Sequence, residues 1–249
     1  MNSRRRPVSA YSEPLDLLLG TLLRVRVLRA LDEANDVRRA SDLARLTSVD
    51  PTALQRTLSP LVDSGLVQRI GNGRGAVYRL NSEHPFASAM RELFAVERER
   101  KHAIPRAVQE WAEHTDPAPI AVWLFGSVAR HEDKFGSDVD LVLVAPGPAA
   151  FPPHANESVP EVARQRSDDL GERLGDALRP IAERMALSPN IIVLLPSELL
   201  ALEHDQSIMW SDLLEHSESL FGQSAQALVR KLKREKSLAL KTRSGPFEE

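Results

Sequence analysis

The chain has 249 residues, of which 42% are hydrophobic, and a formal net charge of −3. This length supports a packed core, more readily as two domains than as one. The absence of cysteine excludes disulfides and thiolate zinc sites. No apolar run approaches the roughly 20 residues that a membrane helix needs, and the N-terminus lacks a signal-peptide core. We therefore predict a cytoplasmic protein with no membrane partner.

Arginine is concentrated in the first third of the chain. Residues 1–85 contain 13 Arg, no Lys and 9 acidic residues, whereas the remainder is net negative. A basic module beside an acidic remainder favours nucleic acid as a partner of the N-terminal part.

Three helices are predicted at the start of the chain. Apolar residues recur at helical spacing from Leu15 to Leu31, which predicts a first helix. Ser41 is expected to cap a short second helix. Asp50 followed by Pro51 is typical of a helix start, because aspartate caps the first amides and proline fits the first helical position.

A β-hairpin is predicted after Gly65, which is expected to end the third helix. Residues 66–70 and 76–80 are predicted strands joined by the glycine-rich turn GNGRG. This order of elements over residues 14–82 resembles the winged helix-turn-helix domain of MarR- and ArsR-type regulators. The resemblance implies that the third helix enters the major groove of duplex DNA, usually within a homodimer.

The same resemblance implies which side chains contact DNA. They are Thr52, Gln55, Arg56 and Ser59 on the third helix, and Arg69, Arg74 and Arg79 on the hairpin, or wing. An alternative stays open, because winged helices also serve as dimerisation or protein-docking modules. Pro60 also counts against groove binding, since it removes a backbone donor from the third helix.

Residues 83–116 are predicted to form a helical connector between two domains. The segment is rich in charge and contains no glycine, which favours a stiff connector. Pro105 is expected to divide it into two helices.

The most informative stretch, FGSVARHEDKFGSDVDLVL, begins at residue 125. Gly126 and Ser127 follow one predicted strand, and Asp138 and Asp140 begin another. Alternate residues of a strand point to the same face, so both carboxylates project together, and oxygen ligands of this kind suit Mg²⁺ or Mn²⁺. The Gly-Ser turn would present amides and a hydroxyl to a phosphate. Together these features indicate phosphoryl or nucleotidyl chemistry.

A Gly-Ser pair, ten intervening residues and Asp-x-Asp on a strand resemble the signature of the DNA polymerase beta-like nucleotidyltransferase superfamily, in its minimal form. The resemblance implies transfer of a nucleoside monophosphate from a nucleoside triphosphate to a hydroxyl group. It implies nucleotide binding by Gly126, Ser127, Arg130 and Ser137, and catalytic, metal-holding roles for Asp138 and Asp140. The alternative is that the two aspartates merely begin a strand at a solvated edge.

The second domain, residues 117–240, is expected to be a small αβ unit. The predicted strands cover 120–125, 138–144 and 190–195, and the predicted helices include 127–134 and 159–187, with a proline-rich loop at 146–160. Ser197 is expected to cap a further short helix. The fold class is therefore α+β in two domains, a winged helix and a nucleotidyltransferase-like domain joined by a helical connector.

Active members of the superfamily use a third carboxylate on a neighbouring strand, which helps to activate the attacking hydroxyl. Here the expected strand NIIVLL contains no acid, and Asn190 stands in that place. Glu198, Glu203 and Asp205 could replace it only if the strand register differed. Two functions stay open: a Mg²⁺-dependent nucleotidyltransferase, and a DNA-binding regulator or antitoxin-like protein whose second domain only senses a nucleotide.

Overall fold

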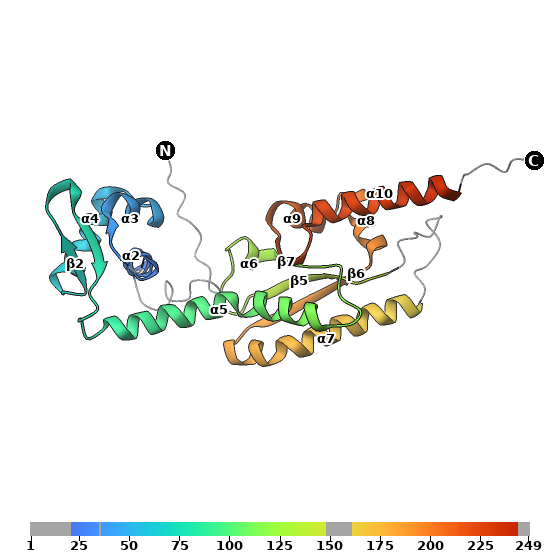
Figure 1. Cartoon of the computed structure of the whole chain (residues 1–249), viewed down its shortest axis with the longest axis horizontal. Helices are drawn as coiled ribbons and strands as arrows, with labels where there is room; N and C mark the ends of the chain where they lie inside the picture. The colour runs from blue at the N-terminus through green and yellow to red at the C-terminus, as the bar shows by residue number, and fades with distance from the viewer. Residues whose placement is uncertain (1–20, 35, 148–160, 244–249) are drawn as a thin grey trace, which may run out of the picture. The chain divides into compact units, whose positions relative to one another are not determined.

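A computed structural model of the protein describes residues 21–34, 36–147 and 161–243 (Figure 1). The chain divides into two compact units, Met1–Lys101 (unit 1) and His102–Glu249 (unit 2). Each unit combines helices with one sheet, so the predicted α+β fold class is confirmed. The predicted domain limits at 14–82, 83–116 and 117–240 stay predictions. The first turns of the predicted first helix and most of the proline-rich loop lie outside the described residues.

Unit 1 has the element order of a winged helix. The structure gives α2 (Leu22–Glu33), β1 (Arg38–Arg39), α3 (Ala40–Thr47), α4 (Pro51–Asp63), β2 (Val67–Ile70), the 3₁₀ turn η1 (Gly73–Gly75) and β3 (Val77–Leu80). The strands β2 and β3 form an antiparallel hairpin, and β1 pairs with the outer edge of β3. The buried core of the unit joins α2, α4 and the hairpin to the first part of a long helix, α5.

The start of α4 follows its predicted signal. Asp50 Oδ1 accepts hydrogen bonds of 2.9 Å from the amides of Thr52 and Ala53. The helix runs through Pro60 and ends just before Gly65, whose φ of +78° favours glycine. Sequence capping signals therefore place this helix correctly.

The start of α3 differs from prediction, because Arg39 and not Ser41 is its N-cap. Arg39 pairs with Val77 in the small sheet, so the chain is extended up to that residue and turns directly into the helix. Ser41 thus lies inside the first turn. A two-residue strand such as β1 leaves no periodic signal in the sequence.

The helix α5 (Ala87–His114) is continuous, and the prediction that Pro105 divides it is wrong. Proline removes one backbone hydrogen bond from a helix. Ile104 and Val108, however, are only 1% and 0% exposed, and this burial outweighs the loss.

Unit 2 contains a four-stranded sheet with the order β6-β5-β4-β7. Its strands are β4 (Ala121–Phe125), β5 (Asp138–Val144), β6 (Ser188–Leu194) and β7 (Glu218–Gly222). The strand β5 pairs antiparallel with β4 and parallel with β6, and β7 pairs antiparallel with β4. The three predicted strands are present, whereas β7 was missed because its exposed edge sequence shows no alternation of buried and exposed residues.

Helices cover both faces of this sheet (Figure 1). On one face lies α7 (Glu161–Met185), so close that a Cβ on Gly171 would lie 2.5 Å from Val193 Cγ2. On the other lie α8 (Pro196–His204), α9 (Ile208–His216) and α10 (Ala225–Arg243), which bury Trp123 and Trp210 in a shared core. Layers on both sides explain why β5 is apolar without interruption after its aspartates.

Two short helices of unit 2 depart from prediction. The helix after the Gly-Ser turn, α6, spans only Gly126–Ala129, because His131 adopts a left-handed conformation with φ +56°. The N-cap of α8 is Leu195 and not Ser197, and the Leu195 amide donates to Glu198 Oε2 at 2.8 Å.

Among the helices in the described ranges, none combines the length and apolar character needed to cross a bilayer.

Candidate functional site

The Gly-Ser turn lies directly beside the aspartate pair. Phe125, the last residue of β4, pairs with Asp140 of β5, so the next residue begins the turn against that carboxylate. Gly126 has a φ of +73°, and a Cβ at this position would overlap Asp140 Oδ2 and lie 3.2 Å from its Cγ. Glycine is therefore required here both by backbone conformation and by space.

Asp138 and Asp140 project from the same face of β5. Asp138 is exposed, Asp140 is half-buried, and Val139 between them is 1% exposed on the opposite face. The arrangement expected from strand geometry is thus present, with two carboxylates one residue apart at the open end of the strand.

Asn190 stands opposite Asp140 on the neighbouring strand. The parallel pairing of β5 and β6 places Asp140 beside Asn190, and Asn190 Nδ2 donates to Asp140 Oδ1 at 2.9 Å. An amide therefore occupies the position where the sequence resemblance leads us to expect a third carboxylate. Its nitrogen is a donor and cannot accept a proton from a hydroxyl group.

The other acids considered for that role have different partners. Glu198 binds Arg164 with both oxygens at 3.0 Å and also caps α8. Glu203 accepts from Lys233 at 2.6 Å. Asp205 is the exposed C-cap of α8. No set of three acidic, histidine or cysteine side chains in the described residues is arranged to hold a metal ion.

The aspartate pair fits one divalent cation. Two carboxylates on one face supply hard oxygen ligands, and Mg²⁺ is commonly held by one or two carboxylates together with water and substrate phosphates. The glycine at position 126 keeps the space next to Asp140 free of any side chain. The residues present are therefore compatible with Mg²⁺ or Mn²⁺ at Asp138 and Asp140.

The two serines assigned to nucleotide binding differ in their surroundings. Ser127 is half-buried at the turn, and its hydroxyl forms no hydrogen bond within the described residues. Ser137 Oγ accepts from the Lys134 amide at 2.9 Å and so closes the turn that leads into β5. Ser127 thus has a hydroxyl available to a ligand, whereas Ser137 shapes the approach to Asp138.

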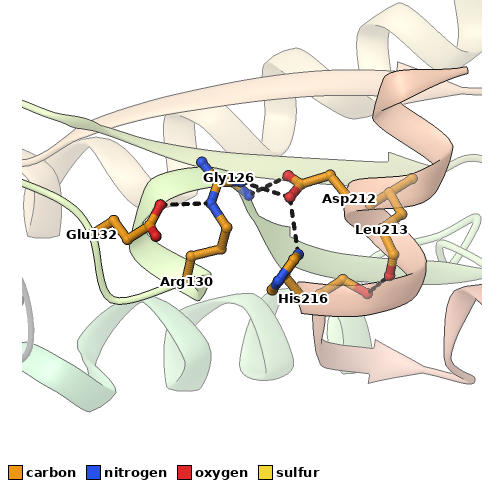
Figure 2. Close-up of polar contacts among 7 residues, drawn as sticks. Gly126, Arg130, Glu132, Asp212, Leu213 and His216 are labelled. Carbon is orange, nitrogen blue, oxygen red and sulfur yellow. Dashed lines mark hydrogen bonds and ion pairs between the residues drawn. The ribbon is translucent and has the colours of Figure 1, made fainter. Parts of the chain in front are cut away.

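Arg130 is held by two carboxylates (Figure 2). Its Nε donates to Glu132 Oε2 at 3.0 Å, and its Nη1 donates to Asp212 Oδ1 at 2.6 Å. Hydrogen bonds to Glu132 and then to Asp212 raise the pKa of Arg130 above its ordinary value. The guanidinium is therefore held as a positive charge beside the Gly-Ser turn.

Asp212 is a residue of this site that sequence reasoning missed. From α9 its Oδ2 accepts from the Gly126 amide at 3.2 Å, while its Oδ1 lies 3.3 Å from His216 Nδ1 (Figure 2). Asp212 is 82 residues from Arg130 in the sequence, and the segment WSDLLEH carries no motif. No signal in the sequence could have placed this carboxylate beside the Gly-Ser turn.

The residues expected to contact DNA lie mostly on exposed surfaces of unit 1. On α4, Thr52, Gln55, Arg56 and Ser59 are exposed, opposite the buried Leu54, Leu58 and Leu61. On the hairpin Arg69 is exposed, and Arg79 is exposed but donates to Gln68 Oε1 at 2.9 Å. The side chain of Arg74 lies outside what the structure describes.

One region of the chain matches the model of a known protein family. Residues 104–186 match the model of the nucleotidyltransferase domain, a range that includes the Gly-Ser turn and the aspartate pair but ends before Asn190 and Asp212. No curated protein matches the chain.

Three solved structures are similar to parts of the chain. A MarR-family transcriptional regulator from Silicibacter pomeroyi has 20% identity and a TM-score of 0.31, over 43% of this chain and 69% of that one. A toxin-antitoxin structure with AMP-PNP has 12% identity and a TM-score of 0.30, over 56% of this chain and 91% of that one. A mutant of the toxin-antitoxin MntA-HpeT has 11% identity and a TM-score of 0.29, with the same coverage.

Proposed function

We propose that unit 2 binds a Mg²⁺- or Mn²⁺-nucleoside triphosphate at the Gly-Ser turn and the aspartate pair, and that it transfers a nucleoside monophosphate slowly or not at all. The match of residues 104–186 to the nucleotidyltransferase domain supports the nucleotide site. The hydrogen bond from Asn190 to Asp140 supports slow or absent transfer, because it shows an amide where a third carboxylate would be expected.

Each residue of the site has a role in this proposal. The Gly126 amide and the Ser127 hydroxyl bind phosphate oxygens, and the Arg130 guanidinium offsets their charge. Asp138 and Asp140 hold the cation, which when bound neutralises phosphate charge and activates the phosphoryl group. Asn190 orients Asp140 but cannot take a proton from an attacking hydroxyl. Deprotonation of that hydroxyl therefore has no general base at this position.

The proposal predicts that Asp138→Asn/Asp140→Asn weakens nucleotide binding in the presence of Mg²⁺ by more than about tenfold, because the cation loses both carboxylates. Isothermal titration calorimetry with each nucleoside triphosphate, with Mg²⁺ and with EDTA, measures this. The matched control is Asp168→Asn/Asp169→Asn, which removes the same charge from exposed positions of α7. Equal affinity of the Asp138/Asp140 variant and the unaltered chain would contradict the proposal.

We further propose duplex DNA binding by unit 1, which makes the chain a nucleotide-sensing cytoplasmic regulator or antitoxin-like protein. The exposed polar row on α4 favours this second function, since a recognition helix presents such a row to the major groove. A homodimer would supply two half-sites.

For this second function, Arg56→Ala is expected to weaken binding to random duplex DNA and to lower the slope of log affinity against log salt by about one unit. Fluorescence anisotropy at several salt concentrations measures both quantities. Arg45→Ala on α3, also exposed, is the control for lost charge. Binding that does not depend on salt, or that both variants weaken equally, would rule out the assigned groove-facing role.

A further inference from the structure

The carboxylate of Asp212 already occupies the donors that a phosphate would use. It accepts from the Gly126 amide at 3.2 Å and from Arg130 Nη1 at 2.6 Å (Figure 2). His216, one turn further along α9, lies 3.3 Å from the same carboxylate. A backbone amide and a guanidinium that converge on one anion form an arrangement by which proteins bind phosphate oxygens.

We propose that Asp212 is an internal substitute for a phosphate group, and that a triphosphate binds at the Gly-Ser turn only when the Asp212 side chain leaves it. The inference rests on the proposed nucleotide site and adds a residue that sets its affinity. The Gly126 amide has one hydrogen to donate, so a phosphate can accept it only when Asp212 does not, and two anions this close would also repel each other.

The charges around Arg130 support this competition. Its guanidinium is bound by Glu132 and Asp212, so one positive charge already faces two negative ones. An approaching phosphate therefore meets a site that is negative until Asp212 moves. Since the Asp212 side chain is 19% exposed, its interaction with Arg130 is only partly screened by water.

A role for Asp212 as the missing third metal ligand is not supported. Asp138, Asp140 and Asp212 do not form a metal-binding group, and no such group of three is present anywhere in the described part of the chain. The carboxylate of Asp212 points instead to the amide and the guanidinium of the turn (Figure 2).

Release of Asp212 requires little rearrangement. The helix α9 is anchored by Trp210 and Leu213, which are 4% and 1% exposed. Asp212 and His216 lie on a different side of the helix, where neither is part of the buried core. The side chain can therefore rotate away while α9 stays in place. The apparent nucleotide affinity is then the affinity of the open site multiplied by the fraction of time that Asp212 spends outside it.

The test compares Asp212→Asn with the unaltered full-length chain. Asparagine keeps the size and an acceptor for the Gly126 amide but removes the charge that competes with phosphate. We expect Asp212→Asn to bind inorganic triphosphate and Mg²⁺-ATP on the order of tenfold more tightly, within the usual range for coupled sites. Glu215→Gln, which removes the same charge from an exposed position of α9, is expected to leave the affinity unchanged.

Calorimetry distinguishes the outcomes, with circular dichroism confirming that each variant is folded and Asp212→Ser as a second variant. The inference is supported if Asp212→Asn and Asp212→Ser both bind more tightly than the unaltered chain while Glu215→Gln does not. This includes the case in which the unaltered chain shows no binding. Unchanged or weaker binding by the Asp212 variants, or equal gains in Glu215→Gln, overturns the inference and leaves the nucleotide site standing. If neither the unaltered chain nor any variant binds, the inference and the proposed function both fail.

Discussion

Replacing Glu97 by alanine is expected to destabilise unit 1 by about 3–5 kcal/mol, the usual cost of breaking a buried ion pair. Glu97 on α5 accepts from Arg29 of α2, from Nε at 2.6 Å and from Nη2 at 3.0 Å. The two side chains are only 4% and 11% exposed. The Arg29 guanidinium also lies over the Phe94 ring, 5.8 Å from its centroid.

The distribution of tryptophan allows this effect to be assigned to one unit. The three tryptophans, Trp111, Trp123 and Trp210, all belong to unit 2. Denaturant unfolding followed by far-UV circular dichroism reports both units, whereas tryptophan fluorescence reports unit 2. We expect Glu97→Ala to lower the midpoint of the dichroism transition more than that of the fluorescence transition.

The control for this experiment is Glu92→Ala on the same helix. Glu92 is exposed, and its replacement is expected to change the free energy of unfolding by no more than about 0.5 kcal/mol. A dichroism transition that is the same for Glu97→Ala and Glu92→Ala would show that the pair between α2 and α5 adds no stability.

Replacing Asn190 by aspartate is expected to raise the rate of nucleoside monophosphate transfer in Mg²⁺ by about 10²–10⁴-fold, the usual contribution of a general base. The register of β5 and β6 already places residue 190 beside Asp140, so a carboxylate there completes the group of three. Transfer of label from α-³²P nucleoside triphosphates to the chain itself or to added acceptors measures the rate.

Stability supplies an independent measurement for the same variant. Without Mg²⁺, Asn190→Asp loses an exposed hydrogen bond to Asp140 and places like charges together, which is expected to cost about 1 kcal/mol. Mg²⁺ is expected to restore stability by binding only the folded chain.

Asn190→Ala is the matched control, because it removes the same donor without adding charge. It is expected to show neither transfer nor stabilisation by Mg²⁺ beyond that of the unaltered chain. If Asn190→Asp behaves like Asn190→Ala in both measurements, then the place opposite Asp140 is not that of a catalytic carboxylate.

Local signals in the sequence were sufficient for much of the architecture. The Asp50 cap places α4, and the apolar run after Asp140 places β5, because both signals act within a few residues. Asn190 was expected on a strand next to the aspartate pair, and the parallel register of β5 and β6 places it opposite Asp140. The division at Pro105 was wrong because burial on both sides of a proline is not visible in the local sequence.

By itself, then, the sequence determined most of the elements, the fold class and the juxtaposition of the Gly-Ser turn with the aspartate pair. Only the tertiary structure decided what surrounds that turn. Asp212 reaches Arg130 across 82 residues, and Glu97 reaches Arg29 across 68. Such contacts depend on the packing of whole helices against a sheet or against each other. No periodicity or spacing in the chain records which charged side chain of one helix will face a given donor on another element.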